Sequence, residues 1–127
     1  MDNGKIESPH KGKTGFRRIW NAMFYSFYGF REAYRNEDAF RQEVWLAVVL
    51  IPLALWSPVS GTGKALMIGS VMLILIVELV NSAVEATVDR VSLENHWLAK
   101  RAKDMGSAAV MAALVNAVVV WLLVWLG

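Results

Sequence analysis

The stretch Ala65–Arg90, ALMIGSVMLILIVELVNSAVEATVDR, decides the fold of this protein. It has no charged residue from Ala65 to Val77, and all three of its carboxylates follow in the second half. A helix needs about 20 mostly apolar residues to cross the hydrocarbon layer of a membrane. Ionisable side chains at that depth are costly, and by default they mark a functional site. The stretch therefore predicts a membrane-spanning helix at about residues 65–90 with a polar site at one end.

The composition of the whole chain supports a membrane protein. Of its 127 residues, 56% are hydrophobic and 19% are charged, against about 25% charged residues in an ordinary globular protein. A soluble domain of this size has no interior large enough to hide so many apolar side chains. The absence of cysteine excludes a disulfide-stapled secreted domain, and a net charge of +2 gives no indication of a nucleic-acid partner.

Two further spans are expected. Met105–Gly127 has no charge, which predicts a span at about residues 104–126. A shorter uncharged apolar run, Val44–Trp56, predicts a helix that starts further back, at about 36–57. The Pro- and Gly-containing stretch Ser57–Gly63 then reads as a tight turn. The expected fold is an all-α membrane protein with three transmembrane helices in a single domain, residues 15–127.

The basic residues predict how the chain is oriented. Twelve Lys and Arg residues lie either before the apolar run Val44–Trp56 or within Arg90–Lys103, and only Lys64 lies near the turn between the first and second spans. Lys and Arg concentrate in cytoplasmic segments. We therefore expect a multi-pass protein of a bacterial inner membrane, with a cytoplasmic N-terminus and a periplasmic C-terminus.

The N-terminal part divides into two segments. Residues 1–14 are polar and basic and predict a flexible arm. In residues 15–35 the aromatic and aliphatic side chains recur at helical spacing on one face, which predicts an amphipathic helix in the plane of the membrane surface. Such a helix is either a simple anchor or one wall of an active site at the surface.

One face of the second span is predicted to be polar. Glu78, Asn81, Glu85 and Asp89 fall within an arc of roughly 80° at about 100° per residue. This stripe has to face protein or water rather than lipid. A second polar set is expected at the same membrane level: Asn36, Glu37, Arg41, Glu43, Lys103 and Asp104. Because three spans alone do not enclose such a stripe, we expect a homo-oligomer.

The side chains of this set indicate a reaction class. Oxygen ligands without a His or Cys cluster favour Mg²⁺, which binds one or two carboxylates together with substrate phosphates. Basic side chains suited to phosphate oxygens are Arg18, Lys100, Arg101 and Lys103. Glu78 is the most deeply placed acid, and desolvation suits it to act as a general base toward an alcohol dissolved in the bilayer. Together these groups favour phosphoryl transfer.

Three motifs carry a resemblance to a known family. They are Asn36-Glu37-x-x-Phe40-Arg41-Gln42-Glu43, Glu78-x-x-Asn81-Ser82-x-x-Glu85-x-x-x-Asp89-Arg90 and Ala102-Lys103-Asp104-Met105-Gly106-Ser107-Ala108-Ala109. Over about residues 15–126 the chain resembles the prokaryotic diacylglycerol kinases, and its first motif is more similar to their Gram-negative branch than to the undecaprenol kinases. The resemblance implies a homotrimer with shared active sites, which uses ATP and Mg²⁺ to phosphorylate the hydroxyl of diacylglycerol to phosphatidic acid.

The resemblance also implies roles for individual residues. Glu78 corresponds to the catalytic base, and Glu37 and Glu85 correspond to the metal-binding carboxylates. Residues matching the ATP-binding region are Arg18, Tyr25, Ser26, Glu37, Asn81, Glu85, Glu94, His96, Lys103 and Asp104. Residues matching the lipid-substrate region are Arg18, Glu43, Trp56, Glu78 and Ser107. Supporting positions are Asn36, Arg41, Asp89 and Arg90.

Three other functions stay open from the sequence. An undecaprenol kinase keeps the mechanism and changes the acceptor lipid. An oligomeric cation or proton transporter also explains an acidic stripe, but the outer halves of the expected spans are almost purely apolar, and the polar residues gather at one membrane face. A structural or assembly subunit does not explain a carboxylate as deep as Glu78.

Overall fold

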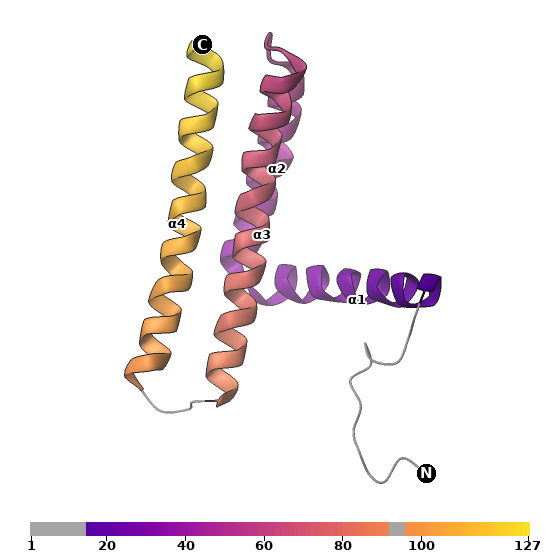
Figure 1. Ribbon diagram of the computed structural model, residues 1–127, viewed down its shortest axis with the longest axis vertical. Helices are drawn as coiled ribbons and strands as arrows, with labels where there is room; N and C mark the ends of the chain where they lie inside the picture. The colour runs from indigo at the N-terminus through magenta and orange to yellow at the C-terminus, as the bar shows by residue number, and fades with distance from the viewer. Residues whose placement is uncertain (1–14, 92–95) are drawn as a thin grey trace.

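The computed structural model describes residues 15–91 and 96–127, and every described element is a helix (Figure 1). The helices are α1 (Gly15–Asn36), α2 (Asp38–Trp56), α3 (Gly61–Val91) and α4 (Trp97–Leu126). The last three are long and apolar enough to cross a membrane, as predicted. The expected flexible arm, residues 1–14, and Glu94 of the expected ATP-binding set lie outside the described residues.

The three long helices form a bundle with α3 as its central member. α3 packs most extensively against α4 and also against α2. The α2–α3 turn and the C-terminus lie at one end of the bundle, and α3 and α4 extend furthest toward the other end (Figure 1). α1 projects from the start of α2 nearly at a right angle to the bundle, and α3 and α4 continue past its level.

The buried interior of the single chain is small and is centred on α3. Its buried apolar side chains are contributed by α3 (Met67, Val71 and Ile74), by α2 (Phe40, Ala47 and Ala54), by α4 (Ala113 and Ala117) and by α1 (Ala33). Small residues on α2 and α4 let these helices approach α3 closely, as is common among membrane helices. Most large apolar side chains remain exposed, as expected of a surface that faces lipid or another subunit.

Two helices begin earlier than the spans expected from hydropathy. α3 begins at Gly61 rather than near residue 65, because the Ser60 hydroxyl accepts a hydrogen bond from the Gly63 N–H (3.1 Å). α4 begins at Trp97 rather than near 104, where His96 Nδ1 accepts from the Leu98 N–H (3.1 Å). Side-chain caps satisfy the free N–H groups of a first turn, and hydropathy carries no information about them.

A tryptophan ties α4 to α3 in the apolar half of the bundle. Trp121 Nε1 donates to the Met67 carbonyl (3.1 Å) and lies 3.2 Å from Ser70 Oγ, whose hydroxyl donates to the same carbonyl (2.7 Å). A polar group surrounded by apolar side chains is costly unless it is hydrogen-bonded. The indole N–H and the Ser70 hydroxyl satisfy each other and hold the two helices in register.

We predict that Trp121→Phe lowers the free energy of unfolding in detergent by about 1 kcal/mol, the usual net value of one hydrogen bond. Trp125→Phe is the control, because the Trp125 indole is 52% exposed, touches the Trp121 ring edge-on and makes no hydrogen bond within the described residues. Equal losses in the two variants, measured by thermal or denaturant unfolding, would show that the hydrogen bond contributes nothing.

Candidate active site

The four residues of the predicted stripe become progressively more exposed along α3. Glu78 is 5% exposed and Asn81 is 9% exposed, whereas Glu85 is half-buried and Asp89 is exposed. The deepest member is therefore shielded by protein, and the outermost reaches solvent near the end of the helix. A ligand that approaches from that end meets the stripe from its exposed side.

Glu37 forms the corner between α1 and α2. It is the one residue between the two helices, and its backbone is extended (φ −115°, ψ 108°). Its N–H still donates to the Ala33 carbonyl (2.9 Å), and its carbonyl accepts from the Arg41 N–H (3.1 Å). The side chain makes no capping hydrogen bond to α2. The half-buried carboxylate is thus free for a ligand, at a helix N-terminus that favours negative charge.

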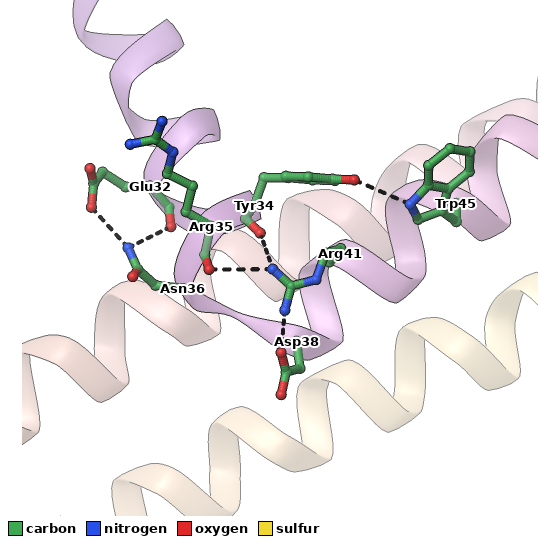
Figure 2. Close-up of polar contacts among 7 residues, drawn as sticks. All are labelled: Glu32, Tyr34, Arg35, Asn36, Asp38, Arg41 and Trp45. Atoms are coloured by element: carbon green, nitrogen blue, oxygen red, sulfur yellow. Dashed lines mark hydrogen bonds and ion pairs between the residues drawn. The ribbon is translucent and has the colours of Figure 1, made fainter.

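Arg41 fixes this corner by reaching back from α2 to α1 (Figure 2). Its Nη1 donates to the carbonyls of Tyr34 (2.7 Å) and Arg35 (3.3 Å), and its Nη2 pairs with the Asp38 carboxylate. The last carbonyls of a helix lack partners within the helix, and a guanidinium group supplies several donors in a rigid fork. Arg41 therefore connects the end of α1 to the start of α2 on both sides of Glu37.

Two further contacts stiffen the same corner (Figure 2). Trp45 Nε1 donates to the Tyr34 hydroxyl (3.2 Å), which joins the second turn of α2 to α1. Asn36 Nδ2 donates to both the carbonyl (3.0 Å) and the carboxylate (2.9 Å) of Glu32. Asn36, a supporting residue in the sequence prediction, closes the last turn of α1 beside Glu37.

Carboxylates from three parts of the chain lie within electrostatic reach of Glu78. The negative charges of Glu85, on the same helix, and of Glu37, at the corner, both act on it, and Glu43 of α2 is coupled to it in the same way. Glu43 Oε2 is buried without a hydrogen-bond partner among the described residues. Negative charges this close repel one another unless a proton or a cation lies among them. The cluster therefore favours the binding of a cation or of a proton.

The oxygens of the cluster fit a cation that arrives together with phosphate. Within residues 15–91 and 96–127, no three His, Asp or Glu side chains form a preformed metal-binding site. Mg²⁺ does not need one, because it keeps several waters and takes one or two carboxylates plus phosphate oxygens. Glu37 and Glu85 offer such carboxylates, and the Asn81 Nδ2 donates to Glu85 Oε1 (3.4 Å).

Basic side chains lie at the same end of the bundle. Lys103 Nζ of α4 pairs with Asp89 Oδ1 of α3 (2.6 Å), and Lys100 Nζ pairs with Asp104 Oδ2 (2.7 Å). All four side chains are substantially exposed, so these pairs contribute little to stability. The first pair holds the Lys103 ammonium group beside Asp89, the outer member of the stripe, where an anionic ligand can exchange with the carboxylate; the second pair lies within α4.

A cavity of about 520 Å³ separates α1 from α3. Its α1 wall includes Ser26 and Asn36, Glu37 stands at the corner, and its α3 wall includes Ser82. This volume is within the range of small-molecule sites, about 300–1,000 Å³. The cavity therefore places three residues of the predicted set, Ser26 and Asn36 of α1 and Glu37 at the corner, opposite α3.

Ser82 has a place in this site that the sequence prediction did not assign. It was quoted in the second motif without a role, yet its hydroxyl is buried, lacks a hydrogen-bond partner among the described residues and belongs to a residue lining the cavity. Helical periodicity could have identified Ser82, because it lies roughly 40° from Glu78 around the helix and borders the polar stripe.

Several predicted residues lie apart from this cluster within one chain. Arg18 is exposed near the start of α1, roughly 27 Å along the helix from Asn36. Trp56 is 84% exposed at the other end of α2, roughly 20 Å along that helix from Glu43. His96 uses Nδ1 to cap α4. Their roles stay predictions, as do those of Tyr25, which is half-buried, and of Ser107 and Arg90, which are exposed.

The fold and the site define a class: a small helical membrane protein with an acidic site at one end of its bundle, beside a basic surface. Comparison with known sequences then identifies the family. A sequence profile of the family described as "Prokaryotic diacylglycerol kinase" matches residues 24–125. The chain belongs to this family, which confirms the resemblance carried by the three motifs.

Its relatives are bacterial proteins of similar length. A protein named diacylglycerol kinase from Pseudomonas aeruginosa is 59% identical over 120 residues, covering 94% of this chain and 98% of the relative. The diacylglycerol kinase of Escherichia coli K12 is 50% identical over 113 residues, covering 88% and 93%. That of Helicobacter pylori strain 26695 is 43% identical over 120 residues, covering 94% and 90%.

We predict that Arg41→Ala frees the last turn of α1. Hydrogen bonds to a charged group are worth about 1.5 kcal/mol or more, so amide hydrogen exchange at residues 34–37 should become roughly tenfold faster. Arg31→Ala is the matched control, because Arg31 is an exposed arginine of α1 with no ion pair in the described part of the chain. Unchanged exchange in Arg41→Ala would show that the corner does not depend on this side chain.

Proposed function

We propose that this protein is an ATP-dependent diacylglycerol kinase that converts diacylglycerol to phosphatidic acid at the cytoplasmic face of a bacterial inner membrane. The observation that carries the proposal is the buried Glu78 carboxylate on α3, with Glu85 on the same helix face and with Glu37 and Glu43 within electrostatic reach. Membership of the family and the names of the relatives from three bacteria support the choice of acceptor.

In the proposed reaction Glu78 acts on the acceptor alcohol. Its carboxylate takes the hydroxyl proton while the hydroxyl oxygen attacks the γ-phosphorus of ATP. The new oxygen–phosphorus bond forms as the bond from that phosphorus to the β-phosphate oxygen breaks, and ADP leaves. A general base in this position contributes about 10²- to 10⁴-fold to the rate. Its depth on α3 selects an alcohol that is dissolved in the bilayer.

Glu37 and Glu85 are the proposed protein ligands of Mg²⁺. The ion supplies charge neutralisation and orientation for the transferring phosphates. Glu37 suits this role because its side chain is not used for capping, and Arg41 holds its backbone in place. Lys103 and the cavity wall that includes Ser26 are proposed to face the nucleotide.

The surroundings of the site support a membrane-surface helix and a homotrimer. α1 projects sideways from the three spanning helices (Figure 1). Most of its aromatic side chains, from Phe16 to Tyr34, are exposed. A helix in that position suits the membrane interface. The outer members of the stripe are not enclosed by their own chain, and a neighbouring subunit in a trimer would cover them. The positive charge near α1 and near the α3–α4 connection supports a cytoplasmic N-terminus and a periplasmic C-terminus.

A transporter is a weaker proposal. A polar pathway would have to continue through the other half of the bundle. There, Ser70 and Trp121 are engaged with each other and with the Met67 carbonyl, and the buried Ser57 donates to the Leu53 carbonyl. The polar groups of the site instead gather at one end.

The test of the proposed function is phosphate transfer from γ-labelled ATP in mixed micelles containing purified protein, Mg²⁺ and either diacylglycerol or undecaprenol. We expect label on diacylglycerol, lost on chelation with EDTA and restored by added Mg²⁺. Label on undecaprenol alone would change the acceptor and keep the mechanism. No label on either lipid, from a folded oligomer, would refute a lipid kinase.

We predict that Glu78→Gln lowers turnover by about 10²-fold or more, because glutamine cannot accept the proton. Assembly and ATP binding should persist, which size-exclusion chromatography and nucleotide titration check. The control is Glu7→Gln, the same substitution at a residue outside the segment that the family profile matches. Its turnover should equal that of the wild type. Wild-type turnover in Glu78→Gln would remove this residue as the base.

A further inference from the structure

Gly106 of α4 stands directly against Asn81 of α3. A Cβ atom built on Gly106 would lie 2.0 Å from Asn81 Oδ1, far inside van der Waals contact. Cβ atoms built on three other helical glycines, Gly29, Gly61 and Gly69, would meet nothing within 4 Å. The contact with Asn81 therefore requires a residue without a side chain at position 106.

The contact leaves the Asn81 side chain little freedom. Oδ1 is buried, has no hydrogen-bond partner in the described part of the chain and rests against the α4 backbone at Gly106. The glycine Cα–H groups are weak donors that tolerate such an oxygen. On the other side of the amide, Nδ2 lies 3.4 Å from Glu85 Oε1, to which it donates. Asn81 is thus held between the α4 backbone and the Glu85 carboxylate.

A side chain at position 106 would disturb both contacts together. Either the Asn81 amide would rotate away from α4, or α4 would move away from α3. Each change shifts Nδ2 relative to Glu85, and it does so next to Glu78, which lies one helical turn away on the same face. Displacement of a reacting group by about 1 Å can cost about 10²-fold in rate.

We infer that Gly106 is a positioning residue for the proposed reaction: its bare backbone orients the Asn81 amide, which in turn orients the Glu85 carboxylate beside Glu78. This inference rests on the proposed function and extends it to a residue that touches neither the reacting phosphate nor the lipid. The sequence predicted only close helix packing for this glycine of the third motif, and the inference adds a role in the reaction.

The first test compares the same exchange at two helical glycines. In the full-length protein, Gly106→Ala should lower kcat for diacylglycerol roughly 10- to 100-fold, while the KM for diacylglycerol changes by less than about twofold. Gly69→Ala, where the added methyl group meets open space, should keep the wild-type kcat. Normal kcat in Gly106→Ala would overturn the inference.

The second test needs neither nucleotide nor Mg²⁺. Thermal unfolding in detergent is measured for Gly106→Ala, Asn81→Ala and the double variant. If the methyl group acts through the Asn81 oxygen, Gly106→Ala lowers Tm in the wild type and causes no further loss in the Asn81→Ala background. Additive losses would overturn the inference. Should Gly106→Ala alone fail to fold, recovery of folded protein in the double variant supports the inference, and no recovery overturns it.

The two tests separate this inference from the proposed function. A wild-type protein that is inactive on diacylglycerol refutes the proposed function and removes the catalytic part of the inference with it. An active wild-type protein whose Gly106→Ala variant is equally active overturns the inference alone and leaves the kinase proposal standing.

Discussion

The arrangement of this structure depends on the free-energy cost of burying the Glu78 carboxylate away from water. Glu78 is 5% exposed on a helix that is long and apolar enough to cross a membrane, and an ionisable group in such a place requires compensation from its surroundings. The protein meets this requirement by collecting its polar groups at one end of the bundle, with ammonium groups of α4 beside them. Toward the other end, the described side-chain hydrogen bonds that join two spanning helices are those of Trp121 with Ser70 and the Met67 carbonyl. This division explains why the site lies at an end of the bundle and not along its length.

The corner between α1 and α2 shows how local structure serves the site. Asp, Asn, Ser or Thr at the start of a helix commonly caps the free N–H groups of the first turn. Glu37 makes no such hydrogen bond, and the corner is held by Arg41 and by the Trp45–Tyr34 contact (Figure 2). Because the arginine supplies the structural contacts, the glutamate carboxylate remains available to a ligand. A single extended residue thus both turns the chain and presents a functional group.

Hydropathy and helical periodicity were sufficient for the coarse architecture. They predicted three apolar helices and a polar face on α3, because both properties depend on residues that are near one another along the chain. The starts of α3 and α4 could not be predicted in this way, since they depend on caps by Ser60 and His96 that lie outside the apolar runs. Helical periodicity places Ser82 beside the polar stripe, but the sequence prediction gave it no role. A serine in a membrane helix commonly hydrogen-bonds to its own backbone, so its presence alone does not indicate a site.

The sequence by itself determined the number of spans, the side of α3 that carries the carboxylates and the family to which the chain belongs. Those properties follow from composition, spacing and motif, which are local. Only the tertiary structure decided that Glu37 and Glu43 join Glu78 and Glu85, that a cavity opens between α1 and α3, and that Gly106 meets the Asn81 oxygen. Each of these depends on the distance between helices far apart in the chain. That distance is set by how closely their side chains pack, so a pattern within any one helix does not contain it.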